Sequence, residues 1–124
     1  MQGELFFEKE TFDLIGCEYT VFNELKFGHS EKYYQRAYAI EIGKKGYAFQ
    51  REFLVPLSYD GRSIGSYRLD FLIGNKIIVE FKVGRDFSPQ YTAQVLGYLK
   101  SLNKKLALII LFTPQGVKVK RIVN

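Results

Sequence analysis

The feature that most constrains the fold is an almost uninterrupted apolar segment, Leu106–Phe112, near the end of the 124-residue chain. A strand that is apolar at nearly every position must be covered on both faces, whereas a strand with one solvated face alternates. A helix signalled by Ser88-Pro89 and extending through Leu102 precedes this segment. The segment therefore predicts a buried strand in a sheet that is flanked by helices.

Local patterns predict eight elements in the order α-α-β-β-β-α-β-β within a single domain, residues 1–124. Two helices are expected first, capped by Thr11 and Ser30. They cover Thr11–Leu25 and Glu31 to about Ile42. Strands are expected at Tyr47–Ser58, Ile64–Ile73, Ile77–Val83, Leu106–Phe112 and Val117–Val123. The third helix crosses between the third and fourth strands, which predicts an α/β domain with a mixed central β-sheet.

Charge and cysteine content narrow the classes of function. Lys and Arg outnumber Asp and Glu by 18 to 13, giving a net charge of +5 that favours a polyanionic partner. Cys17 and His29 are the only residues of their kinds, so an intramolecular disulfide and a four-ligand zinc site are excluded. The start, MQGELFFEKETFD, lacks the pattern of a signal peptide, and no apolar stretch has the length of a membrane span. A cytoplasmic protein without membrane contact is expected.

Two carboxylates and a lysine are expected to share one face of a β-hairpin. If residues 74–76 form a three-residue loop, counting back along the two strands places Asp70 opposite Glu80. Cross-strand partners point to the same face with Cβ atoms about 5 Å apart. Lys82 lies two residues beyond Glu80 and shares that face. The apolar residues between them are expected to line the opposite, core face: Leu69, Phe71, Ile73, Val79, Phe81 and Val83.

Such an arrangement of charges predicts a metal site. Adjacent carboxylates repel each other unless a cation intervenes. Oxygen ligands without histidine or thiolate favour Mg²⁺ or Mn²⁺, and Lys82 could then polarise an attacking water in phosphodiester hydrolysis. The alternative for Asp70, Glu80 and Lys82 is a solvated cross-strand ion pair without catalytic function.

Further motifs accompany this hairpin in a particular order. Residues 28–34, Gly-His-Ser-Glu-Lys-Tyr-Tyr, match a GxxExxY signature, and residues 94–98, Gln-Val-Leu-Gly-Tyr, match a Gln-x-x-x-Tyr motif. With Asp70 and the Glu-x-Lys of Glu80 and Lys82, the chain resembles the PD-(D/E)XK nuclease superfamily, in particular its GxxExxY proteins and its RecB-like branch. The proline that names the superfamily motif is absent, because Arg68-Leu69 precedes Asp70.

The resemblance implies a restriction-endonuclease-like core and a role for each matching residue. Asp70, Glu80 and the carbonyl of Phe81 would bind the metal, Glu31 would bind it directly or through water, and Lys82 would serve the nucleophile. Substrate contacts are implied for Gln94 and Tyr98, which would touch the nucleic-acid backbone or orient the metal ligands, and expected for Tyr34 and Arg68, with Glu52 in a supporting role. The alternatives are a helix-dipole contact for Glu31 and an amphipathic rim for Gln94 and Tyr98.

The expected function is a Mg²⁺- or Mn²⁺-dependent nuclease, with DNA favoured over RNA as the substrate. Binding would rest on phosphate contacts from Lys44, Lys45, Lys100, Lys104 and Lys105 and would lack sequence specificity. The limited surface of so small a chain makes a homodimer a reasonable assembly for enclosing a duplex. Two alternatives remain: a catalytically inactive nucleic-acid- or partner-binding module that retains the fold, and a structural subunit whose nine Tyr and eleven Phe form an oligomer interface.

Overall fold

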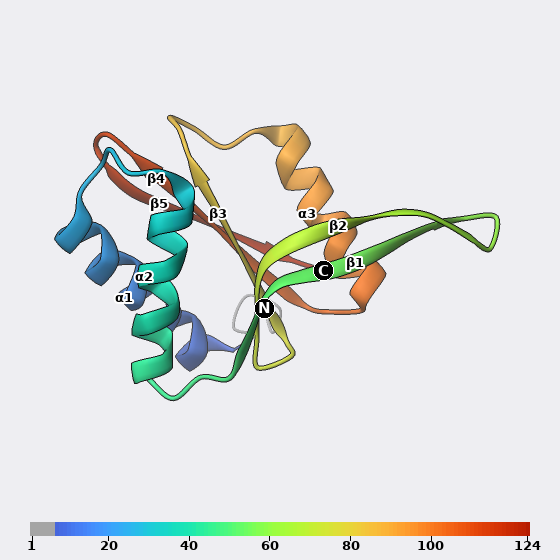
Figure 1. Cartoon of the computed structure of the whole chain (residues 1–124), viewed down its shortest axis with the longest axis horizontal. Coiled ribbons are helices and arrows are strands. Elements are labelled where there is room, and N and C mark those ends of the chain that lie inside the picture. Colours follow the sequence, from blue (N-terminus) through green and yellow to red (C-terminus); the bar gives the residue numbers. More distant parts are fainter. Residues whose placement is uncertain (1–6) are drawn as a thin grey trace.

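A five-stranded mixed sheet forms the centre of the molecule (Figure 1). The structure is a computed structural model and describes residues 7–124. The strands lie side by side in chain order, with bounds β1 Phe49–Tyr59, β2 Arg62–Ile73, β3 Ile77–Val83, β4 Leu106–Thr113 and β5 Gly116–Val123. β3 and β4 are parallel and the other neighbours are antiparallel. The predicted α/β class and element order are therefore confirmed.

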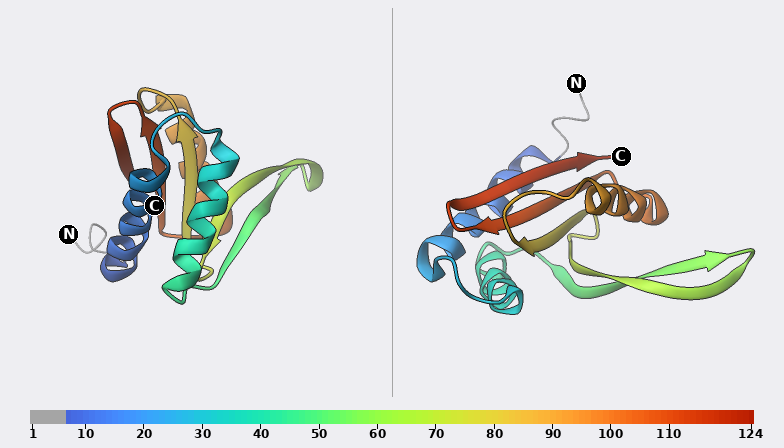
Figure 2. Two further views of the ribbon diagram at one scale, coloured as in Figure 1. Left: turned by 60° about the vertical axis from the view of Figure 1, so that its left-hand side comes forward. Right: turned by 90° about the horizontal axis from the view of Figure 1, so that it is seen from above.

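Helices cover both faces of this sheet (Figure 2). α1, Glu8–Leu25, and α2, Glu31–Lys44, pack on one face in a cluster of buried side chains. α3, Pro89–Leu102, packs on the other face in a second cluster. All eight residues of β4 are buried, as its apolar sequence predicts. Because α3 connects two parallel neighbours, the predicted crossover between the third and fourth strands is confirmed. Among the described helices, none is long and apolar enough to cross a membrane.

The helix starts agree only in part with the prediction. Ser88 accepts a 3.2 Å hydrogen bond from the Tyr91 N–H and caps α3 as expected. Ser30 occupies the cap position of α2 without a side-chain cap bond. The prediction for Thr11 is wrong, because α1 begins at Glu8 and the Thr11 hydroxyl instead accepts a 3.2 Å hydrogen bond from Arg121. The sequence start MQGELF, used above in the argument against a signal peptide, lies outside the described residues.

The predicted division of the hairpin into one core face and one charged face holds only in part: Phe71, Ile73, Val79 and Phe81 share one buried cluster as predicted, while Val83 is exposed. Phe71 and Phe81 belong to the cluster under α1 and α2, whereas Leu69 belongs to the cluster under α3. Glu80 is only 4% exposed. The physical reason is that α3 covers the second face of the sheet, so the carboxylates lie inside a three-layer structure.

The β1–β2 hairpin extends well beyond the other strands (Figures 1 and 2). Its outer residues carry exposed apolar side chains, among them Leu54, Leu57, Tyr59, Ile64 and Tyr67. Only its inner half reaches the core, at Val55 and Leu69. The hairpin therefore forms an arm beside α3.

Candidate active site

Asp70 and Glu80 meet where the ladder between β2 and β3 ends. The ladder pairs Ile73 with Ile77, as the expected three-residue loop requires, and its outermost pair is Phe71 with Val79. At the next position the Asp70 N–H donates to Glu80 Oε2 at 2.7 Å, and the Phe81 N–H donates to Asp70 Oδ2 at 2.7 Å. Each carboxylate therefore replaces a main-chain carbonyl as the acceptor, which fixes both acids between the parting strands.

On its other side β2 pairs with β1, and this pairing is irregular opposite Asp70. Arg51 pairs with Phe71 and Phe53 with Leu69, while Glu52 between them has a left-handed backbone, φ 53°. Such a conformation is rare and costly for a residue with a side chain. The interruption explains why Leu69 and Phe71, two residues apart, face opposite sides of the sheet. Asp70 therefore lies at a twist in β2.

Burial and mutual repulsion perturb both acids. Burial raises the pKa of Asp70, although the Phe81 N–H and Lys82 act against this rise. Burial and the neighbouring Asp70 charge raise the pKa of Glu80 to about 7, with Tyr91, the Asp70 N–H and Lys82 acting in the opposite direction. Two carboxylates in a low-dielectric site cannot both ionise cheaply at neutral pH. The pair therefore carries negative charge that a cation would relieve.

Tyr91 is a residue of this site that sequence reasoning missed. Its hydroxyl donates to Glu80 Oε1 at 2.5 Å, and the Nζ of Lys82 lies 4.3 Å from the centre of its ring. The phenol thus contacts the acid through its polar end and the ammonium through its face, a favourable cation–π geometry. No local pattern marks Tyr91, because the contact depends on how α3 crosses β3.

Glu31 approaches the pair from the N-terminal end of α2. Burial and the Asp70 charge raise the pKa of Glu31, while Lys82 and the Val83 N–H lower it. These influences mean that the half-buried carboxyl lies within electrostatic reach of Asp70 and Lys82. Asp70, Glu80 and Lys82 lie together where β2 and β3 part, and Glu31 comes toward them from the start of α2.

Gln35 and Arg51 also lie near Asp70 and influence it, and sequence reasoning missed both residues. The Arg51 guanidinium donates to Gln35 Oε1 at 3.5 Å, and both side chains lower the pKa of Asp70. Gln35 follows Glu31 by one helical turn, so the two share a face of α2. That i, i+4 spacing is the signal that could have identified Gln35.

Residues with expected substrate contacts occupy different environments. The prediction for Tyr34 is wrong: its side chain is 0% exposed, its ring stacks on Phe112 at 4.2 Å, and its hydroxyl donates to the Lys26 carbonyl at 2.6 Å. Tyr34 lies three residues after Glu31, and the helix turns that position into the core. Its hydrogen bond holds the α1–α2 loop in place, and its side chain has no exposed surface that a substrate could contact.

Arg68 and Glu52 lie together on the outer part of the hairpin. Because β2 and β3 part at Asp70, Arg68 does not pair with β3; it pairs with Leu54 of β1 instead. Its guanidinium lies 3.9 Å from the Glu52 carboxylate, and both side chains are exposed. The structure therefore gives Arg68 a carboxylate partner on the arm.

Gln94 and Tyr98 line a pocket between α3 and the arm. Tyr98 is buried in the cluster under α3 with Val95 and Leu99, so the amphipathic-rim alternative does not describe it. Gln94 is exposed.

Four of the lysines expected to bind phosphate lie at the end of the sheet that is opposite Glu31 and Lys82. Lys44 and Lys45 end α2, about 20 Å along the helix from Glu31. Lys104 and Lys105 precede Leu106, which pairs with Ile77 at the far end of β3 from Lys82. Lys100, the fifth, lies in α3.

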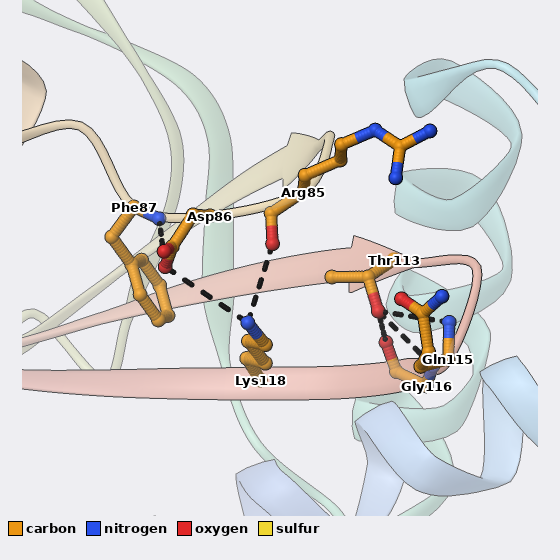
Figure 3. Close-up of polar contacts among 7 residues, drawn as sticks. All are labelled: Arg85, Asp86, Phe87, Thr113, Gln115, Gly116 and Lys118. Atoms are coloured by element: carbon orange, nitrogen blue, oxygen red, sulfur yellow. Dashed lines mark hydrogen bonds and ion pairs between the residues drawn. The ribbon is translucent and has the colours of Figure 1, made fainter.

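Other basic residues lie level with Lys82, two strands away on β5. The pairings align Lys82 with Leu111 and Leu111 with Lys118, and they align Glu80 with Ile109 and Ile109 with Lys120. Lys118 donates to the Arg85 carbonyl at 3.3 Å and lies 3.9 Å from Asp86, which fixes the loop after β3 (Figure 3). This loop, with Lys82 and Tyr91, lines a cavity of about 270 Å³.

The acids fit a hard divalent cation in chemistry, though not as a pre-built cage. Among residues 7–124, no three His, Cys, Asp or Glu side chains gather into a metal-binding group. Asp70 and Glu80 nevertheless offer carboxylate oxygens whose repulsion a cation would offset. A third ligand would come from the main chain, Glu31, water or substrate.

Comparisons with known proteins bear on this fold and sequence. Among solved structures, the chain is similar to the crystal structure of SSO0001, with a TM-score of 0.50 and 16% identity. The match covers 86% of this chain and 61% of that one, so the chain spans less than two thirds of that protein, and the likeness concerns the fold alone. Comparison with curated proteins gives no match. The sequence matches the family profile described as the PD-(D/E)XK nuclease superfamily over residues 8–122, which is nearly its whole length, and the chain therefore belongs to that superfamily.

Proposed function

We propose that this protein is a divalent-metal-dependent nuclease that hydrolyses phosphodiester bonds, with DNA as the favoured substrate. The single observation that carries the proposal is the Asp70–Glu80 pair, half-buried at Asp70 and buried at Glu80, with Lys82 close enough to act on both acids. Superfamily membership supports the reaction class. Burying two neighbouring carboxylates costs free energy. A cation bound between them, with a substrate phosphate beside Lys82, would offset that cost and explain why these groups lie together.

In the proposed mechanism, Asp70 and Glu80 would hold Mg²⁺ or Mn²⁺ together with the Phe81 carbonyl, and Glu31 would assist directly or through water. The bound ion would supply Lewis-acid stabilisation of the charge on the phosphoryl oxygens and acidify its bound water. The Lys82 ammonium, held over the Tyr91 ring, orients the attacking water and offsets charge in the transition state. Tyr91 keeps one Glu80 oxygen in place through its hydrogen bond.

Phosphate contacts are proposed for the basic residues at the same end of the sheet as Lys82. Lys118 and Lys120 are exposed on β5, and exposed Arg85 follows β3. A nucleic-acid backbone that passes across this end of the sheet would meet these residues in turn. The salt dependence of binding should therefore decrease in a Lys118→Ala, Lys120→Ala double variant.

Plasmid cleavage with Mg²⁺ or Mn²⁺ tests the proposal. Asp70→Ala, Glu80→Ala and Lys82→Ala should each reduce cleavage by about a hundredfold or more, because each removes an interaction made in the transition state. Asp60→Ala, at the exposed hairpin turn, and Lys44→Ala, at the end of α2 far from Glu31, are the matched controls and should cleave like the parent protein. Equal activity in all six proteins would point to a contaminating nuclease and against the site.

A second candidate function is an inactive nucleic-acid-binding module that retains the fold. It is favoured by the missing three-ligand group among the described residues and by the main-chain hydrogen bonds that already engage both acids. Metal titration distinguishes the two candidates. For the nuclease, millimolar Mn²⁺ should raise the melting temperature of the parent protein and leave that of Asp70→Ala unchanged. An identical response of the two proteins would favour the binding module.

A further inference from the structure

A second pocket lies between the arm and α3. Its volume is about 240 Å³. It is lined from the arm by residues that include Pro56, Leu57 and Tyr67, and from α3 by residues that include Gln94, Gly97 and Tyr98. The rings of Tyr67 and Tyr98 meet at 5.2 Å with a 49° tilt, and Tyr67 remains 38% exposed. The pocket thus offers an aromatic wall to a ligand.

Its position links this pocket to the proposed reaction. Tyr67 precedes Asp70 by three residues of β2, which is about 10 Å along a strand. Tyr98 packs in the cluster under α3, on the side where Tyr91 reaches Glu80. Burial and the charges of Glu80 and Asp70 raise the pKa of Tyr98 to about 12, which reflects the closeness of the acids. A phosphate at the acids would therefore place a neighbouring base near the pocket.

The lining selects for an uncharged, flat group. No lining residue carries a charge, so the pocket has no means to neutralise a phosphate. The volume lies below the roughly 300–1,000 Å³ of sites that hold drug-sized ligands, which suits a single ring system. Gln94 offers both an amide donor and an acceptor at this pocket, the groups that read the edge of a base.

We propose that this pocket holds one unstacked nucleobase of a single-stranded nucleic acid whose phosphate lies at the Asp70–Glu80 pair. The inference rests on the nuclease function proposed above and names its substrate class. The base stacks on the exposed ring of Tyr67, which Tyr98 supports from behind, while its edge meets Gln94. A base inside a duplex is covered on both faces by its neighbours and cannot enter.

Gly97 gives a direct way to block the pocket. A Cβ built on Gly97 meets no atom within 4 Å, so a larger side chain would extend into open space. Replacing a helical glycine also favours the helix, which protects the variant from unfolding. Gly43→Leu is the matched control, because Gly43 is an exposed helical glycine of α2 with equally open surroundings.

The test is a binding titration in Ca²⁺, a hard oxygen-binding cation used in place of Mg²⁺ or Mn²⁺ so that the acids can hold the phosphate, with three fluorescein-labelled DNA probes of equal length whose integrity is checked after binding. The probes are a single strand, the same strand with abasic sites, and its duplex. The parent protein and Gly43→Leu should bind the intact single strand about tenfold more tightly than the abasic strand, the usual effect of stacking on an aromatic ring. Gly97→Leu and Tyr67→Ala should lose this preference while binding the abasic strand normally.

Opposite results would overturn the proposal. Equal binding of intact and abasic strands by the parent protein would show that no base is recognised, and tighter binding of the duplex would assign another substrate class. If Gly97→Leu still bound the intact strand more tightly than the abasic strand, the base would be recognised outside this pocket. These outcomes are separate from the fate of the nuclease proposal, which depends on Mg²⁺-dependent cleavage in the plasmid assay.

Discussion

The hydroxyl of Tyr91 donates a 2.5 Å hydrogen bond to Oε1 of Glu80, so a helix on one side of the sheet positions an acid of its central strand. Tyr91→Phe removes this bond and keeps the ring beneath Lys82. Because hydrogen bonds to charged groups contribute about 1.5–3 kcal/mol, we expect the free energy of unfolding at pH 8 to fall by about 2 kcal/mol. Urea denaturation measures the change, and Tyr59→Phe, at the exposed arm, should show none.

Tyr91→Phe should also affect the reaction if Glu80 binds metal. The freed carboxylate would be held less firmly, so the Mn²⁺ concentration for half-maximal cleavage should rise. A loss of stability without a change in metal requirement would restrict Tyr91 to a structural role.

The Asp70–Glu80 pair predicts how stability depends on pH. The folded protein binds the Glu80 proton more tightly than the unfolded chain does, since its pKa is about 7 against an ordinary 4.5. The stability gained from this proton is complete below pH 4.5 and is lost as pH rises through about 7. Asp70→Asn removes the repelling charge, so the pKa of Glu80 should fall, and the variant should exceed the parent in stability at pH 8 by about 1–2 kcal/mol.

Carboxyl NMR titration and urea denaturation in metal-free buffer check this prediction. Asp60→Asn is the control, because Asp60 has a left-handed backbone, φ 51°, that Asn also tolerates. An unchanged Glu80 pKa in Asp70→Asn would mean that burial alone perturbs the acid.

Tyr34 should matter for stability and not for catalysis. Tyr34→Phe loses the bond to the Lys26 carbonyl and leaves that loop less well held, which should lower the free energy of unfolding by about 1 kcal/mol. Cleavage per folded molecule should stay unchanged. The neighbouring Tyr33, which is 47% exposed, supplies the control variant Tyr33→Phe. If Tyr34→Phe instead had normal stability and a reduced turnover, the substrate contact expected from the sequence would be supported.

Glu18 is a buried acid with no assigned function. Neither of its carboxyl oxygens accepts a hydrogen bond of ordinary geometry from the described residues. Burial raises the pKa of Glu18 well above its usual value, and the Tyr38 hydroxyl, which donates to the Leu14 carbonyl at 3.3 Å, offsets only part of this rise. Glu18→Leu should therefore stabilise the protein at pH 8 by about 1–3 kcal/mol, since an unsatisfied buried group is removed.

The sign of this effect follows from the raised pKa. The stability that the Glu18 proton provides is present at low pH and is lost as pH rises, so the advantage of Glu18→Leu should shrink at pH 4. Thermal unfolding at the two pH values measures it. Glu24→Leu, on the exposed side of the same helix, should not show this pH dependence.

Sequence reasoning succeeded where local chemistry decides structure. The turn at residues 74–76 sets the register that brings Asp70 to Glu80, and Ser88-Pro89 sets the start of α3. It failed where a contact depends on packing between elements. Tyr91 reaches Glu80 only because of the path of α3, and a regular period of two could not foresee the twist at Asp70 that moves Leu69 to the other face.

The left-handed turn at Glu52 also affects how β1 meets other molecules. β1 is an edge strand, and such edges invite pairing with strands of further copies. Glu52 interrupts the regular course of that edge, and Pro56 removes one N–H from it. An incoming strand would therefore find an interrupted series of hydrogen-bonding groups along β1, beside the exposed apolar side chains of the arm.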